Sequence, residues 1–286
     1  YKDADGDGFG VDDDFVDSCE GIKHGYVSSL STSSSVMRFT NANTEGKTGP
    51  DQEAINIAYG NTILKDKVEI NTQGIQEWVV PETATYNIIA VGAAGGDGYY
   101  STNSTVKEGG KGAKMSGLFA LTQGETLQIL VGQKGSEETS YSHRPGGGGG
   151  GTFVVTSDNT PLIIAGGGGG GGNPNYGQTD GGNAIVDETS SDTGSEGEGG
   201  SASSYNGGGA GFNGNGSTSS SAIANSFING GVGGHNTSGH ATQSVGGFGG
   251  GGAGGLLPGG GGGYSGGKAI GSWSSSGSAF GGGSYN

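Results

Sequence analysis

The sequence GGGGGGTFVVTSDNTPLIIAGGGGGGG, residues 146–172, places a short apolar segment between two runs of pure glycine. Thr152–Val155 and Leu162–Ala165 are rich in β-branched residues, and a polar stretch that ends at Pro161 separates them. β-Branched residues favour strands, whereas Ser, Asp, Asn and Pro favour turns, so the segment predicts a β-hairpin. Because so apolar a hairpin must bury its side chains, we expect another part of the chain to cover it.

The glycine runs Gly146–Gly151 and Gly166–Gly172 allow two interpretations. Glycine loses more backbone entropy on ordering than any other residue, which favours a flexible linker. Glycine can also form ordered polyglycine-II threads, with about three residues per turn and a rise of about 3.1 Å per residue. Such threads pack backbone against backbone through N–H···O=C and Cα–H···O contacts. A linker would tolerate a side chain at Gly168, whereas a packed thread would not.

Glycine and charge set the class of the protein. Of the 71 glycines, 20 precede residue 146 and 51 lie from there onward, which marks a structural boundary. The formal net charge of −15 leaves no basic face for phosphates, so we expect no nucleic-acid partner and no binding to an anionic membrane surface. No run of about 18 apolar residues occurs, so no membrane insertion is expected. The acidity fits a secreted or cell-surface protein and the binding of divalent cations.

The N-terminal sequence YKDADGDGFGVDDD, residues 1–14, has the spacing of a twelve-residue calcium loop. A hard cation takes about six to eight oxygen ligands, and Gly8 supplies the sharp turn. The sequence therefore predicts a Ca²⁺ site, and the alternative interpretation is a solvated acidic leader. The predicted ligands are the side chains of Asp3, Asp5, Asp7 and Asp14, with Asp12 as a possible substitute, and the backbone carbonyl of Phe9.

The chain is predicted to divide into a calcium-binding segment (1–20), a linker (21–35), a β-sandwich (36–145) and a glycine-rich bundle (146–286). Asp51–Tyr59 is predicted to be a short helix, because Ala54, Ile55 and Ala58 fall on one face. The expected strands of the sandwich are Gly74–Pro81, Thr85–Gly96, which ends in small residues, Leu118–Leu121 and Thr126–Val131. The expected core residues are Trp78, Tyr86, Phe119 and Leu130. Strands that alternate with turns in this way favour a jelly-roll sandwich.

Several segments resemble a known family when they are taken in order. GIQEWVVP (74–81), TYNIIAVGAAGG (85–96), GETLQILVGQKG (124–135), GGGGGGTFVV (146–155) and PLIIAGGGG (161–169) are similar to the glycine-rich extracellular domain of the anaplastic lymphoma kinase and leukocyte tyrosine kinase receptors. The resemblance covers roughly Arg38–Gly283. It implies a tumour-necrosis-factor-like jelly-roll sandwich merged with a polyglycine-II bundle. The matched region contains no cysteine, unlike the receptors, so the cytokine binding of the receptors is not carried over.

The N-terminal segment carries a second resemblance. Its DADGDG motif resembles the calcium loops of thrombospondin-type-3 repeats and of bacterial surface-protein repeats. Cys19, the single cysteine of the chain, and the following Gly25–Val27 are similar to the end of one such bacterial repeat. A single cysteine allows no internal disulfide, so Cys19 is a free thiol, an inert loop residue or the partner of a cysteine outside this sequence.

We find no catalytic constellation and expect no enzyme. No serine lies in a nucleophile elbow, and His235 and His240 have no third metal ligand nearby in the sequence. The acidic segment Thr179–Glu198 is read as a solvated loop rather than a second cation site.

Two functions remain. The first is an extracellular structural or adhesive protein, a bacterial-type surface or fibre subunit that calcium stabilises and that self-associates through its N-terminal segment or its sheet edges. The second is a recognition module that binds a glycan or a protein through loops of the glycine bundle.

Overall fold

The computed structural model describes residues 36–100, 105–137, 145–203, 206–218, 221–236, 244–271 and 278–286. The chain divides into two compact units, Tyr1–Arg38 and Phe39–Asn286, and the second is described below. The first 35 residues lie outside the described part, and with them Cys19 and every predicted calcium ligand: Asp3, Asp5, Asp7, Phe9, Asp12 and Asp14.

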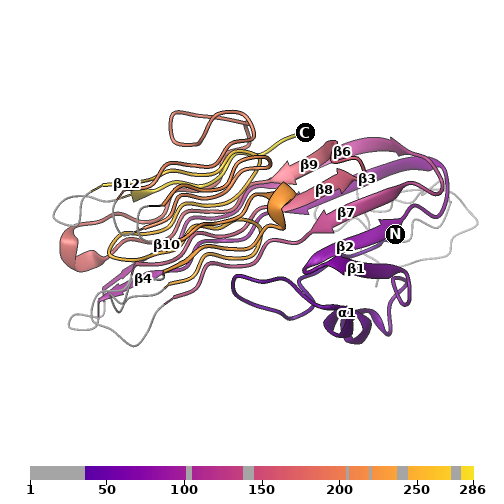
Figure 1. The fold of residues 1–286 in the computed structure, drawn as a ribbon, viewed down its shortest axis with the longest axis horizontal. Coiled ribbons are helices and arrows are strands. Elements are labelled where there is room, and N and C mark those ends of the chain that lie inside the picture. The colour runs from indigo at the N-terminus through magenta and orange to yellow at the C-terminus, as the bar shows by residue number, and fades with distance from the viewer. Residues whose placement is uncertain are drawn as a thin grey trace, which may run out of the picture. The chain divides into compact units, whose positions relative to one another are not determined.

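The described residues form an all-β fold with very little helix, as the sequence predicts (Figure 1). Its elements are, in chain order, α1 (Gln52–Tyr59), β1 (Val68–Thr72), β2 (Ile75–Val79), β3 (Ala84–Val91), β4 (Gly98–Tyr100), β5 (Thr105–Lys107), β6 (Lys114–Leu121), β7 (Thr126–Leu130), β8 (Thr152–Thr156), β9 (Pro161–Ala165), the 3₁₀ turns η2 (Pro174–Tyr176) and η3 (Phe227–Asn229), β10 (Ser221–Ala222), β11 (His235–Asn236), β12 (Ala269–Ile270) and β13 (Ser278–Ala279).

Two antiparallel sheets make the sandwich. The larger has the strand order β1-β2-β7-β8-β9, and the smaller pairs β3 with β6. β3 and β6 contact β8 and β9, and Trp78 of β2 meets Tyr86 of β3 edge to face, with ring centroids 6.1 Å apart. Strands β8 and β9 form the predicted hairpin. The smaller sheet covers one of its two faces.

Strands β8 and β9 of the larger sheet are covered on both faces, which explains why they are apolar without alternation. Cross-strand pairing aligns Ile75, Leu130, Phe153 and Ile164 on the face opposite the smaller sheet. That face packs against aromatic side chains of the glycine-rich half: Phe212, Phe227, Phe248, Tyr264 and Tyr285.

The predicted core is correct for two residues and only partly correct for two. Trp78 and Leu130 are buried. Tyr86 and Phe119 lie opposite each other in β3 and β6 and are half-buried. They are less covered because their sheet has only two strands, so no further strand shields its flanks.

Helix α1 forms where the sequence predicts it. The carboxylate of Asp51 accepts a hydrogen bond of 2.9 Å from the backbone amide of Ala54 and so caps the helix N-terminus. Ile55 and Tyr59 are the buried residues of the helix. The hydroxyl of Tyr59 donates to the fully buried side chain of Gln76 at 2.7 Å, which ties the helix to β2.

Replacing Asp51 by Ala is expected to lower the free energy of unfolding by about 1 kcal/mol, because the backbone amide of Ala54 at the helix N-terminus loses its hydrogen-bond partner. Chemical denaturation of the two proteins measures the difference. Asp51→Asn is the matched control, since asparagine caps helices as well as aspartate does and should leave stability within about 0.5 kcal/mol. An equal loss in both variants would contradict the capping role.

The run Gly146–Gly151 is an ordered thread whose amides bond with a period of three. The amides of Gly146 and Gly149 donate to the carbonyl oxygens of Gly171 and Gly168, each at 2.8 Å. The other amides follow the same rule with other neighbours: Gly147 and Gly150 bond to Ser136 and Gln133, and Gly148 and Gly151 bond to Gly252 and Gly249. A period of three is the repeat of a polyglycine-II helix, and acceptors that step backward by three belong to antiparallel neighbours.

The run Gly166–Gly172 lies inside the bundle and bonds to segments on every side. Its amides donate to backbone carbonyl oxygens at 2.7–2.9 Å, and donors three residues apart bond to the same neighbouring segment. Gly167 and Gly170 donate to Gly262 and Gly259, Gly168 and Gly171 to Ala93 and Gly96, and Gly169 and Gly172 to Gly182 and Thr179. Its carbonyl oxygens accept from Gly110, Ala113 and Gly282, as well as from the first run. No glycine of either run has a positive φ, so both threads have the left-handed sense of polyglycine II. These bonds exclude the linker interpretation.

The thread Gly92–Gly98 meets the central run Gly166–Gly172 at every third residue. A Cβ added at Gly92, Gly95 or Gly98 would lie 2.0, 2.1 or 1.9 Å from a carbonyl oxygen of the central run. Ala93 lies between them, is half-buried and carries its side chain without such a clash. Glycine at every third position is therefore the minimum for contact with the central run, and Gly96, whose added Cβ would lie 2.2 Å from the carbonyl oxygen of Ser136, packs against a further thread. A pure glycine run has such neighbours on every side.

The sheets and the bundle are continuous in the chain (Figure 1). β3 runs into the thread Gly92–Gly98, and β9 runs into Gly166–Gly172. The composition predicts a division between residues 145 and 146, but backbone hydrogen bonds cross this boundary. Strands β8 and β9 follow it and join the larger sheet beside β7, whereas the thread Gly92–Gly98 precedes it and joins the bundle.

Candidate functional site

The described residues contain no cluster of three or more His, Cys, Asp or Glu side chains that could hold a metal ion. In the acidic segment that starts at Thr179, Asp180 lies 3.9 Å from the ammonium of Lys107 and accepts a hydrogen bond of 3.1 Å from the amide of Glu108. Asp180 thus serves to attach this loop to the neighbouring thread. The predicted calcium site stays a prediction, because it lies outside the described residues.

His235 lies in β11, and His240 is outside the described residues. Burial, and then the charge of Lys47, lowers the pKa of His235. Its Nδ1 atom is buried and has no hydrogen-bond partner. Both effects favour the neutral imidazole, and among the described residues His235 belongs to no group of three or more potential metal ligands.

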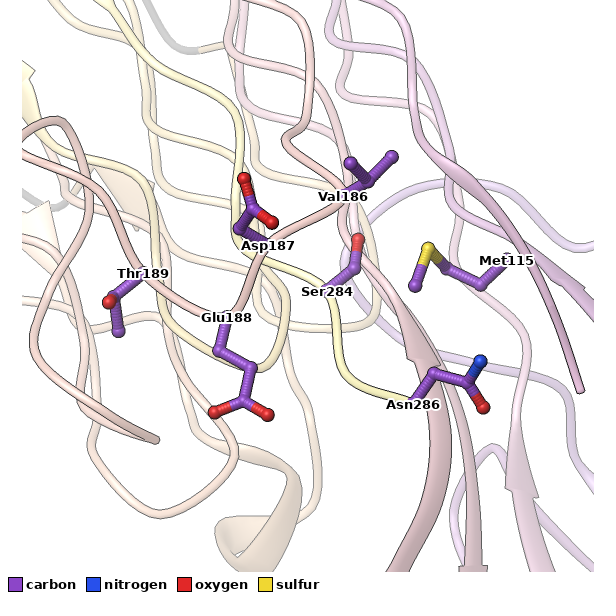
Figure 2. Close-up of a pocket in the computed structure, with 7 residues that line it drawn as sticks. All are labelled: Met115, Val186, Asp187, Glu188, Thr189, Ser284 and Asn286. Carbon is purple, nitrogen blue, oxygen red and sulfur yellow. The ribbon is translucent and has the colours of Figure 1, made fainter.

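An open pocket of about 400 Å³ lies beside the C-terminus (Figure 2). It is lined by Met115, Val186, Asp187, Glu188, Thr189, Ser284 and Asn286. The hydroxyl of Ser284 donates to the carbonyl of Ile185 at 2.7 Å and accepts from the amide of Gly166 at 3.1 Å. Since this hydroxyl is committed to the backbone, Ser284 is not an activated nucleophile.

The edges of the sheets are the remaining candidates, because unpaired strand edges are the usual docking positions of β-proteins. The edge of β9 is closed by Tyr285, which exchanges two backbone hydrogen bonds of 2.9 Å with Ile164. β6 is touched at its outer side by Asn286, whose amide side chain donates to the carbonyl of Ser116 at 3.1 Å.

The edge of β1 is closed by a side chain from α1. The Gln52 carbonyl accepts from the amide of Ile70 at 2.8 Å, and its NH₂ group donates to the carbonyl of Val68 at 3.0 Å. One glutamine thus replaces a neighbouring strand for these two residues.

β3 differs from these edges. Within the described residues no strand pairs with the side of β3 that faces away from β6. Only at its end does the hydroxyl of Thr152 donate to the carbonyl of Val91, at 2.6 Å. The strand reads ATYNIIAV and contains no charged residue and no proline. Ile89, Val91 and Leu118 on the outer face of β3 and β6 are 55%, 54% and 74% exposed.

The sequence predicts self-association through sheet edges but does not indicate which edge is open. The closing residues Gln52, Tyr285 and Asn286 have no local signal, since each closes a strand that is distant in sequence. The uncharged strand ATYNIIAV was visible in the sequence, because natural edge strands usually carry a charge, a proline or a bulge.

Comparison with known proteins gives a partial relationship. The mouse leukocyte tyrosine kinase receptor is 36% identical to this chain over 101 residues. The aligned part is 35% of this chain and 11% of the receptor. The homology is to the extracellular region of the receptor. No family model matches the chain. No helix of the described residues is long and apolar enough to span a bilayer.

Proposed function

We propose that the protein is an extracellular structural or adhesive subunit, a rigid non-catalytic module that associates with copies of itself into a surface fibre. The observation that carries the proposal is the bundle itself. Every amide of Gly146–Gly151 and of Gly167–Gly172 bonds to the backbone of a neighbouring thread, which makes a stiff body without side-chain chemistry. An open strand edge on such a body suits end-to-end assembly. The homology to a receptor's extracellular region supports the location.

Electron microscopy of the purified full chain tests the proposal. We expect filaments at high protein concentration in the presence of Ca²⁺, with a repeat set by the subunit. Monodisperse single particles at every concentration, with and without Ca²⁺, would contradict self-assembly.

We propose that residues 1–20 bind Ca²⁺ through the loop Asp3–Asp14, separately from the sandwich. Chelation is expected to change the protease sensitivity of this segment and to leave the unfolding midpoint of residues 39–286 unchanged. Calorimetry with Ca²⁺ and with a chelator measures the second effect. The variant Asp5→Asn in Ca²⁺ should reproduce the chelated state. Melting of the whole protein on chelation would show that the loop is not a separate segment.

A second function, recognition of a glycan or protein ligand, is favoured by the partial homology to a receptor. Saturable binding of one glycan class on an array, unaffected by protein concentration, would favour it over self-assembly.

A further inference from the structure

We infer that the open edge of β3 pairs with β3 of a second copy of this chain, in antiparallel orientation, so that two smaller sheets join into one. The inference deepens the proposed function by naming one self-contact, and it rests on that proposal only for its biological use. Two identical edges that pair around a two-fold axis close into a dimer, so a fibre also needs a second, different contact between such dimers.

The first argument is the contrast between the edges. Gln52 occupies the edge of β1, Tyr285 closes β9, and Asn286 bonds at the side of β6. In the described part of the chain, β3 alone among the sandwich edges has none of these protections along Ala84–Ala90. A long, uncharged edge strand is a template for a further strand.

The second argument is electrostatic. The net charge of −15 opposes contact between most surfaces of two copies. The outer face of the β3–β6 pair carries no acidic side chain. Its positions, which alternate with the inward-facing ones, are Thr85, Asn87, Ile89, Val91, Lys114, Ser116, Leu118 and Ala120. A second copy therefore meets little repulsion here.

The third argument gives the orientation. Glu82 precedes β3, and Lys114 lies across from Val91 at the other end of the strand; both are exposed. Antiparallel pairing brings Glu82 of each copy toward Lys114 of the other, whereas parallel pairing would bring like charges together. In this register Asn87 lies near the centre of the joint, and the exposed Ile89 of each copy lies opposite Thr85 of the other.

Cysteine cross-linking of the full chain tests the pairing. In a Cys19→Ser background, Thr85→Cys, Asn87→Cys and Ile89→Cys place one thiol each on the outer face of β3. Directly opposite residues of paired antiparallel strands have Cα atoms about 4.5–5.5 Å apart, within the range that a disulfide spans. We expect mild oxidation to give a disulfide dimer at one of these positions, with much less at its neighbours. Ser116→Cys on β6 is the matched control on the same face and should stay monomeric.

A second measurement covers the case in which cysteine disturbs the strand. Ile89→Lys should weaken the self-association constant from analytical ultracentrifugation at least tenfold and leave the melting temperature nearly unchanged, because the residue is exposed. Equal cross-linking at all positions, or association unaffected by Ile89→Lys, would overturn the inference. Filaments that survive Ile89→Lys would leave the proposed function standing without this contact. A β3 cross-linked dimer without filaments would confirm the contact and contradict the fibre.

Discussion

Replacing Gly168 by Ala is expected to destabilise the protein by about 3 kcal/mol or more, at the upper end of the range for overpacked interiors. The added Cβ would lie 1.9 Å from the carbonyl oxygen of Gly110 and 2.3 Å from its carbonyl carbon. Both atoms are backbone, so no side-chain rotation relieves the clash. The thread is held by neighbours on every side, so a shift of Gly110 must move further threads. Val at the same position should be worse, and chemical denaturation of each variant measures the loss.

Gly60→Ala is the control for this substitution. Gly60 has φ −55° and ψ −25°, which alanine adopts readily, and its added Cβ would meet only the carbonyl oxygens of Asn56 at 3.1 Å and Ile57 at 3.6 Å. We expect a change within about 1 kcal/mol, since alanine also restricts the unfolded chain. Equal stability of Gly168→Ala and the unmodified protein would restore the flexible-linker interpretation of the glycine runs.

Replacing Phe153 by Ala is expected to cost about 3–5 kcal/mol, the usual loss for a buried phenylalanine. Phe153 is 1% exposed and comes from β8. Its ring stacks on Phe227 with centroids 5.2 Å apart, and Phe227 stacks in turn on Phe212 at 5.4 Å. The side chain thus joins the larger sheet to the glycine-rich half, and its loss leaves a cavity between them.

Leu118→Ala is the control for Phe153→Ala, because Leu118 is 74% exposed and its truncation should change stability by less than about 0.5 kcal/mol. The two halves should also unfold together. With Trp273 replaced by Phe, fluorescence reports on the sheet through Trp78, and glycine amide signals report on the bundle. A cost below about 1 kcal/mol for Phe153→Ala, or separate unfolding transitions in the unmodified protein, would contradict the junction described here.

Much of the fold follows from local sequence. Val79, Ile88 and Val154 lie in β-branched segments that are strands, and Asp51 marks the start of the helix that it caps. The pure glycine runs are also explained by the sequence. A thread that is surrounded by backbone on every side has no room for a Cβ, so each of its residues must be glycine. The same rule requires glycine at every third residue where a thread meets the central run, as at Gly92.

Other features depend on contacts between distant residues. The half-burial of Tyr86 follows from the width of the smaller sheet, which no local pattern sets. Gln52 and Tyr285 close strand edges far from themselves in sequence, so their roles follow only from the tertiary arrangement. The acidic loop near Asp180 is predicted to be solvated, and the Asp180 side chain is 64% exposed; its ion pair with Lys107 of β5, more than seventy residues earlier in the chain, has no local signal. The calcium loop of residues 1–20 remains a prediction from spacing.

Hydrogen exchange of the glycine amides tests most directly whether the runs are packed threads. The amides of Gly146–Gly151 and Gly167–Gly172 bond within the bundle, and those of Leu127 and Val154 lie in the larger sheet. We predict that both groups exchange with comparable protection, close to the free energy of global unfolding. Exchange of the glycine amides at unfolded-chain rates, with protected sheet amides, would contradict the polyglycine-II bundle and return these runs to linkers.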